Sequence, residues 1–130
     1  MSSEATICST LGTTLRQRLS GSMVFKHADM SGTIMPDFSV TWGGRTIWLE
    51  IKLIDRLLVK SKEAQKEMMR RLDTAGQAYY VVYSRDPHAV FMLRPALIDR
   101  LSDTEPISSG WNHVAVSEMV RSLLLVERER

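Results

Sequence analysis

The chain has a single cysteine, Cys8, among its 130 residues, and no apolar run that approaches the length of a membrane span. One cysteine cannot form an intramolecular disulfide, which is typical of proteins from a reducing compartment. A transmembrane helix needs about 20 consecutive apolar residues. A signal peptide needs early basic residues, and the first here is Arg16. These absences predict a cytoplasmic protein that has no membrane partner.

The sequence also lacks internal repeats, low-complexity segments and long Gly/Pro/Ser-rich linkers. Hydrophobic residues make up 44% and charged residues 25%, which is ordinary globular composition and excludes extensive disorder. A chain of this length can bury a core without disulfides or metal. We therefore expect a single domain over 1–130, with a core at about 9–84 and a C-terminal extension at about 85–130.

The formal net charge is only +2, but the basic residues are unevenly distributed. Eight basic and four acidic residues lie between Arg45 and Arg71, so the remainder of the chain carries a small negative charge. A basic centre of this kind is typical of proteins that bind phosphates. A solvated helix face would give the same pattern, because Lys and Arg are common on any surface.

Hydrophobic periodicity and turn residues predict an α-β-β-β-α-β order. Ser9 is the expected N-cap of the first helix, Ser61 that of the second and Ser117 that of the last. Gly43-Gly44 suits a two-residue turn between two strands. The expected elements are a helix at 9–20, strands at 22–27, 36–42 and 45–52, a polar loop at 28–33, a helix at 62–75 with apolar positions 64, 68, 72 and 75, a buried strand at 77–84, a strand at 90–93, a short helix at 95–101, a loop at 103–112 and a helix ending near 126. This order predicts an α/β fold with a mixed central sheet flanked by helices.

Charged residues gather where the two central strands meet. Asp37 lies at the start of one hairpin strand, while Glu50 and Lys52 lie at the end of the other, two residues apart and therefore on one face. Two carboxylates at close range suppress each other's ionisation. A hard divalent cation removes that conflict, because carboxylate oxygens suit Mg²⁺ or Mn²⁺. Trp48, on the same face, either floors such a site or simply packs.

A structural interpretation of these residues stays open. Glu50 and Lys52 would then form a cross-strand or surface ion pair, and Asp37 would cap a turn.

Pro36-Asp37, twelve intervening residues and Glu50-Ile51-Lys52 resemble the motif of the PD-(D/E)xK nuclease superfamily. Within it, the chain is most similar to small virus-type replication–repair nuclease domains and to Holliday-junction-resolvase-like enzymes. The segment GTIMPD resembles the glycine-containing approach to the motif, and LDTAGQAYYVVYS resembles the following helix end and buried strand. Gln65 lies early in the helix after the motif, where these domains carry a glutamine near the site.

The resemblance implies the roles of these residues. Asp37 and Glu50 would ligate Mg²⁺, with Mn²⁺ able to substitute, and the backbone carbonyl of Ile51 would be a third ligand. Lys52 would position the attacking water and stabilise charge on the phosphate. Gln65 would orient that water, the lysine or a nearby phosphate. The implied reaction is metal-assisted hydrolysis of a phosphodiester.

One position departs from the family pattern. Many relatives supply a further acidic ligand from the first helix, but residues 11–20 contain no Asp or Glu. Glu4 is the upstream candidate, provided that the helix begins near Ser3. The missing acid favours an alternative, a non-catalytic nucleic-acid-binding module that retains the nuclease fold. A weaker third interpretation is a small α/β interaction protein with no role in nucleic-acid binding.

The leading hypothesis is a structure-specific DNA endonuclease acting on branched, flapped or four-way junction DNA in phage or mobile-element replication or repair. No base-reading module is visible, so we expect low sequence specificity and contacts mainly to phosphates. The resemblance implies a homodimer, with 54–59 and 114–126 as candidate surfaces. The expected DNA-binding residues are Arg45, Lys60, Lys62, Lys66 and Arg70.

Overall fold

The computed structural model describes residues 3–27 and 34–126, so the loop predicted at 28–33, with the first two residues of GTIMPD, lies outside the described residues. The predicted α-β-β-β-α-β order is confirmed, and further elements follow it. The elements are α1 (Glu4–Arg18), β1 (Met23–Lys26), β2 (Phe38–Trp42), β3 (Arg45–Ile54), α2 (Glu63–Ala75), β4 (Gln77–Ser84), β5 (Ala89–Leu93), the 3₁₀ helix η1 (Pro95–Asp103), β6 (Ser108–Ser109) and α3 (His113–Leu125).

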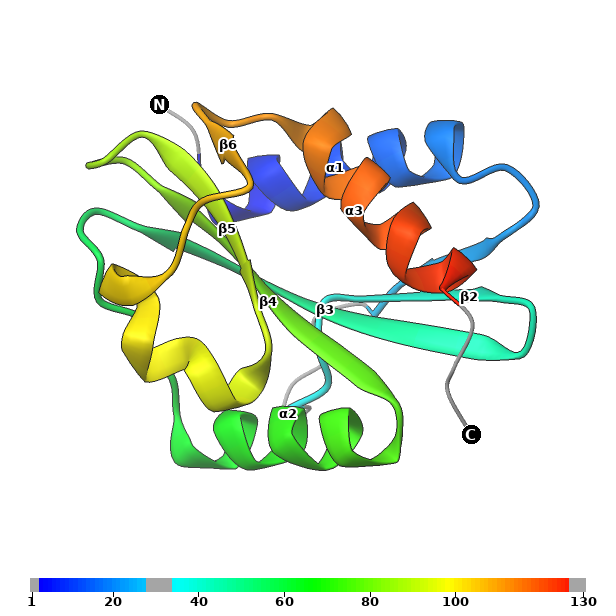
Figure 1. Ribbon diagram of the computed structural model, residues 1–130, viewed down its shortest axis with the longest axis horizontal. Helices are drawn as coiled ribbons and strands as arrows, with labels where there is room; N and C mark the ends of the chain where they lie inside the picture. Colours follow the sequence, from blue (N-terminus) through cyan, green and yellow to red (C-terminus); the bar gives the residue numbers. More distant parts are fainter. Residues whose placement is uncertain (1–2, 28–33, 127–130) are drawn as a thin grey trace.

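The six strands form one mixed sheet in the order β1-β2-β3-β4-β5-β6 (Figure 1). Neighbouring strands are antiparallel except β3 and β4, which run parallel and are connected through α2. The predicted turn joins β2 to β3, and both of its glycines have positive φ, 58° at Gly43 and 77° at Gly44. Such angles suit a tight hairpin turn and are strained for residues with a Cβ.

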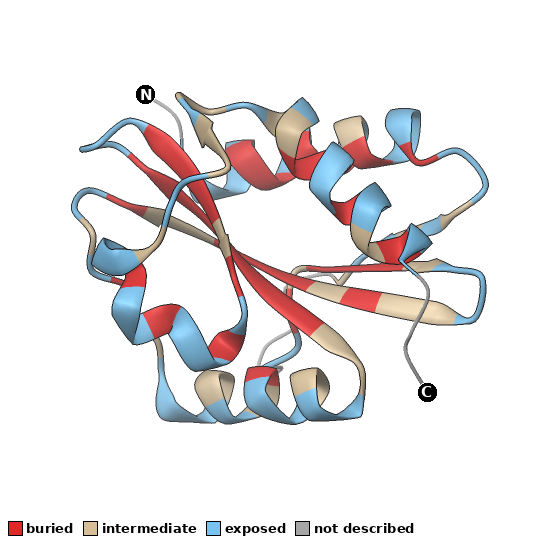
Figure 2. Cartoon of the chain, in the orientation of Figure 1, coloured by how far each residue is buried: buried red, intermediate tan, exposed pale blue. Residues whose placement is uncertain are grey.

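Helices cover both faces of the sheet (Figure 1). On one face, α1 and α3 pack over a core that includes Leu11, Leu15, Ile51 and Val120. On the other face, α2 and η1 enclose a second core around residues such as Met69 and Tyr80. Figure 2 shows the buried residues following the central strands between these two layers. The predicted α/β class with a mixed, helix-flanked sheet is thus confirmed.

Helix α1 begins earlier than predicted. Ser3, and not Ser9, is the N-cap, and its side chain accepts a hydrogen bond from the backbone N–H of Thr6. Ile7 and Cys8 extend the buried leucine stripe toward the N-terminus. The prediction was wrong because residues 6–10 are all β-branched or small, and such residues favour helices only weakly. Burial of the apolar stripe outweighs that weak propensity.

Helix α2 is rotated relative to the prediction. Met69 is its one fully buried side chain, whereas Ala64 and Ala75 are exposed. The N-cap is Lys62, which makes no side-chain cap bond, so the predicted cap at Ser61 was wrong. The rotation turns Gln65, half-buried and one helical turn before Met69, toward the sheet. The sheet residues that Gln65 meets are described below.

The last helix also begins earlier than predicted. Asn112 is its N-cap and accepts a hydrogen bond from the backbone N–H of Ala115, whereas Ser117 is buried within the helix. The Ser117 hydroxyl donates to the carbonyl of Val114, which satisfies a buried polar group locally. The segment predicted as a loop before this helix contains the short strand β6, which pairs with β5.

Apolar side chains are exposed at both predicted dimer surfaces. On α3 and just beyond it, Val114, Met119, Leu125 and Val126 are 37–57% exposed. In the 54–59 segment Leu58 is 68% exposed, while Val59 and part of Leu57 pack into the second core. None of the helices that the structure describes combines the length and hydrophobicity needed to cross a bilayer.

Candidate active site

A fork in the sheet positions the acidic residues. Strand β2 begins at Phe38, opposite Leu49, but β3 continues beside β4 as far as Ile54. The backbone N–H groups of β3 beyond that point therefore have no strand partner on the β2 side. Carboxylates replace the strand: Asp37 Oδ2 accepts from the N–H of Ile51 at 2.8 Å, and Glu4 Oε2 accepts from the N–H of Leu53 at 3.0 Å.

This arrangement brings Glu4 beside the motif. Because α1 begins at Glu4, the first helix does carry an acidic residue, and the condition set by the sequence is met. Its carboxylate is held two residues along β3 from the group that binds Asp37. The structural interpretation of the sequence has Asp37 capping a turn. In the structure the Asp37 side chain instead binds the backbone of β3.

Glu50, Lys52 and Gln65 form a hydrogen-bonded triangle on the α2 face of the sheet. Gln65 Nε2 donates to Glu50 Oε2 at 2.9 Å, and Gln65 Oε1 accepts from Lys52 Nζ at 2.8 Å. Lys52 Nζ is also 3.3 Å from Glu50 Oε2. The side chains of Lys52 and Glu50 are only 15% and 5% exposed, so their ion pair is not a surface pair. The rotation of α2 supplies the third corner of the triangle.

Burial and like charge raise the pKa values of both acidic motif residues. Desolvation is the main cause for Glu50, followed by the charge of Asp37, and together they raise the pKa of Glu50 to about 7. Desolvation also raises the pKa of Asp37, against the lowering effect of its hydrogen bond from Ile51. The charge of Glu4 raises both pKa values further. The site therefore holds more negative charge than its single lysine offsets.

The donor set fits a hard divalent cation. Asp37 and Glu50 offer carboxylate oxygens whose mutual repulsion a cation would relieve. The carbonyl of Ile51 projects to the same edge of β3 as its N–H, at the fork, because both groups of a strand residue point to one side. Within the described ranges, no three His, Cys, Asp or Glu side chains form a complete metal cluster by themselves. Asp37, Glu50 and the Ile51 carbonyl are the oxygen donors that would fit such an ion, and the Glu4 carboxylate also lies at the fork.

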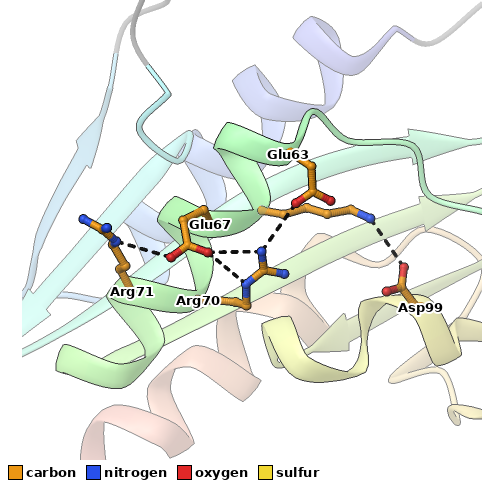
Figure 3. Close-up of polar contacts among 6 residues, drawn as sticks. Glu63, Glu67, Arg70, Arg71 and Asp99 are labelled. Carbon is orange, nitrogen blue, oxygen red and sulfur yellow. Dashed lines mark hydrogen bonds and ion pairs between the residues drawn. The ribbon is translucent and has the colours of Figure 1, made fainter.

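The predicted DNA-binding residues do not form one continuous basic face. Arg70 lies between Glu63 and Glu67, with ion pairs of 3.5 and 3.2 Å, as Figure 3 shows. Lys66 Nζ is 3.6 Å from Asp99. Arg45 donates to the carbonyl of Leu124 at the end of α3, five residues along β3 from Glu50. Acidic partners therefore offset much of the positive charge on α2.

Lys60 and Lys62 are exposed and make no ion pair among the described residues. Lys60 lines an open groove that also contains Lys52 and Glu4. Arg56 lines the same groove and was not among the predicted DNA-binding residues. Its position in the basic central segment was the available signal. The groove offers a path by which a polyanion would reach the fork.

The fold is similar to that of a solved Holliday junction resolvase. The match is to Hjc from the archaeal hyperthermophile Archaeoglobus fulgidus, with a TM-score of 0.53. It covers 69% of this chain and 74% of the resolvase, at 15% sequence identity. The chain thus has a restriction-endonuclease-like fold. No protein-family model matches the sequence, and no curated protein matches it either.

Proposed function

We propose that this protein is a metal-dependent endonuclease of the PD-(D/E)xK superfamily that cuts branched DNA. The observation that carries the proposal is the convergence of Asp37, Glu50, Lys52 and Gln65 at the fork between β2 and β3. These residues come from two strands and a helix, and structural stability alone does not favour burying two repelling carboxylates with one lysine. The similarity of the fold to that of a Holliday junction resolvase supports the proposal of a nuclease.

Asp37, Glu50 and the Ile51 carbonyl would hold Mg²⁺ or Mn²⁺, and Glu4 is the candidate for an additional ligand. When bound, the ion would supply Lewis-acid polarisation of a phosphate oxygen and a lower pKa for a bound water. Side chains of the protein position the water and stabilise the developing charge. Lys52, held by Gln65 at 2.8 Å, donates to the attacking water and to the phosphate oxygens as negative charge develops. Gln65 fixes the lysine and keeps Glu50 hydrogen-bonded.

DNA is held mainly through its phosphates. Lys60 and Arg56 line the groove, and Lys62 follows Lys60 by two residues. None of the three makes an ion pair with another residue that the structure describes. Lys66, Arg70 and Arg45 contribute only by leaving their present partners. Contacts of this kind carry no base sequence, which fits a substrate recognised by its shape. Cutting a four-way junction symmetrically takes two active sites, so a homodimer formed through the exposed apolar residues of α3 is part of the proposal.

A non-catalytic DNA-binding module was favoured by the lack of an acid on the first helix. In the structure α1 begins with Glu4, whose carboxylate lies at the fork, so the first helix does supply an acid there. The virus-type replication–repair subtype and a role in phage or mobile-element DNA stay predictions from the resemblance.

The direct test is incubation of the protein with Mg²⁺ or Mn²⁺ and matched linear, flapped and four-way junction DNAs. We expect metal-dependent cleavage of the branched substrates, with little cleavage of the linear duplex. The Glu50→Gln variant is the control for a contaminating nuclease. Cleavage that persists in Glu50→Gln, or no cleavage of any substrate with either metal, would contradict the proposal.

A further inference from the structure

A row of side chains crosses three strands beside the candidate active site. Phe25 on β1 is the register partner of Ser39 on β2, which in turn is the partner of Trp48 on β3. Register partners lie on one face of a sheet. Trp48 and Glu50 are two residues apart on β3, so this is also the face that carries Glu50 and Lys52.

His27 completes the row. Its Nε2 is 2.9 Å from Ser39 Oγ, and its ring stacks on Trp48 with centroids 5.3 Å apart and an interplanar angle of 29°. Its backbone N–H donates to the carbonyl of Asp37 at 2.8 Å. The imidazole is therefore fixed directly beside a motif residue. Within the described part of the chain its other ring face makes no aromatic contact.

This part of the face is open in the described structure. Phe25 is 51% exposed. Its side chain lies on the face of the sheet opposite to the core that α1 covers. Helix α1 packs against β1 from the opposite face, where Val24 joins the core, and α2 packs against β4. The row contains no acidic side chain, so it does not repel a polyanion.

We propose that Phe25, His27 and Trp48 form a stacking platform for an unpaired base of the DNA, next to the phosphate that is cut. This inference rests on the proposed function and names the feature of the substrate that is recognised. Aromatic faces bind bases by stacking whatever the sequence. The bases of an intact duplex are already stacked on one another, so only an unpaired base at a flap, gap or junction can reach the platform.

The position of the platform supports a nucleotide as the occupant. A nucleotide joins an anionic phosphate to a flat aromatic base. The site has the same arrangement, because Asp37 is hydrogen-bonded to the backbone of His27, and Glu50, which pairs with Lys52, lies two residues along β3 from the Trp48 ring. A second copy of this chain pairing with β1 would instead cover Phe25 without any need for Lys52.

The test measures binding in EDTA, so that it does not depend on cleavage. Fluorescence anisotropy compares a duplex carrying one unpaired 2-aminopurine with the fully paired duplex of the same length. Phe25→Leu removes the ring and keeps an apolar side chain, and Phe25→Tyr keeps the ring. Met23→Ala is the matched control, because Met23 is 56% exposed on the same face of β1 as Phe25, two register pairs further from Asp37.

We expect Phe25→Leu to weaken binding of the unpaired substrate about tenfold, the scale of one lost stacking contact, and to change duplex affinity less than twofold. Emission of 2-aminopurine should be quenched by the parent and by Phe25→Tyr, and restored in Phe25→Leu. Met23→Ala should match the parent. Thermal melts of the variants confirm that each is folded.

Equal losses on both DNAs, or no loss on either, would overturn the platform. So would a change from dimer to monomer in Phe25→Leu by sedimentation, because a second copy would then be the occupant. A parent that binds and cuts branched DNA while Phe25→Leu behaves identically overturns this inference and leaves the nuclease proposal intact. A parent that binds no DNA overturns both.

Discussion

Asp37 Oδ2 accepts a hydrogen bond of 2.8 Å from the backbone N–H of Ile51, so the residue before one hairpin strand caps the free edge of the other. The bond fixes a carboxylate beside Glu50, which is 4% exposed and already raised in pKa by burial. One side chain thus satisfies a backbone group of β3 and forms part of the proposed cation site.

Metal binding should depend on both carboxylates. We expect the Asp37→Asn and Glu50→Gln variants to lose Mn²⁺ binding in calorimetric titration, because each removes a charged ligand. Asp37→Asn should be no less stable than the parent without metal, because it relieves repulsion and an amide oxygen can still accept the hydrogen bond from Ile51. Glu118→Gln, an exposed acid on α3, is the matched control. Undiminished binding in both site variants would place the metal elsewhere.

The stability of the metal-free protein should depend on the protonation of Glu50. Its pKa is raised from 4.5 to about 7 in the folded state, so folding favours the protonated carboxyl. The contribution is fully present below pH 4.5 and is lost as pH rises through about 7. A few kcal/mol at most are involved, since one pKa unit corresponds to about 1.4 kcal/mol. Denaturant unfolding at several pH values should show a shallower decline in Glu50→Gln. Parallel curves for the parent and the variant would refute the raised pKa.

Gln65 should stabilise the site as well as orient Lys52. Replacing it with Ala leaves the buried Glu50 without its amide donor, which typically costs about 1–3 kcal/mol. We expect a lower melting temperature for Gln65→Ala than for Gln17→Ala, the control at an exposed glutamine on α1. Equal melting temperatures for the two variants would show that the hydrogen bonds to Gln65 contribute nothing.

The sequence predicted the centre of this site because strand alternation determines which side chains share a face. The period of two residues along a strand predicts that Glu50 and Lys52 share a face, and the two glycines at 43 and 44 predict the hairpin turn. The position of Glu4 was harder to predict, because residues 6–10 have weak helix propensity and are helical through burial of Ile7 and Cys8. The inward rotation of α2 was missed for a similar reason. A stripe of Ala and Met looked more apolar than the one containing Gln65, but it is Gln65 that finds partners in Glu50 and Lys52.

DNA affinity should fall steeply with salt, because phosphate contacts release counterions. The Lys60→Ala/Lys62→Ala double variant should bind every DNA more weakly by a similar factor and should flatten the slope of log affinity against log salt. A matched double variant, Arg70→Ala/Arg71→Ala, should have a smaller effect, since Glu67 pairs with both arginines and Glu63 pairs with Arg70. Fluorescence anisotropy over a salt series measures both. An unchanged slope in the Lys60/Lys62 variant would contradict the assignment of these lysines to phosphates.

Replacing Lys52 tests the proposed active site most directly, because a catalytic lysine and a lysine that only pairs with Glu50 have different effects on cleavage. In the proposed mechanism its ammonium acts on charge that develops in the transition state, and losing one such group typically costs about 100-fold or more in turnover. Removing it from its buried pair with Glu50 also lowers stability, so a melt alone does not distinguish the two roles.

The deciding measurement is single-turnover cleavage of a four-way junction by Lys52→Ala, at saturating enzyme and Mn²⁺ and below its melting temperature, beside Lys26→Ala as the exposed-lysine control. The proposed mechanism predicts a rate at least about 100-fold below that of the parent, with junction affinity within a few-fold, and a parent-like rate for Lys26→Ala. A folded Lys52→Ala protein that cuts the junction at the parent rate would contradict the assignment of this fork as the active site.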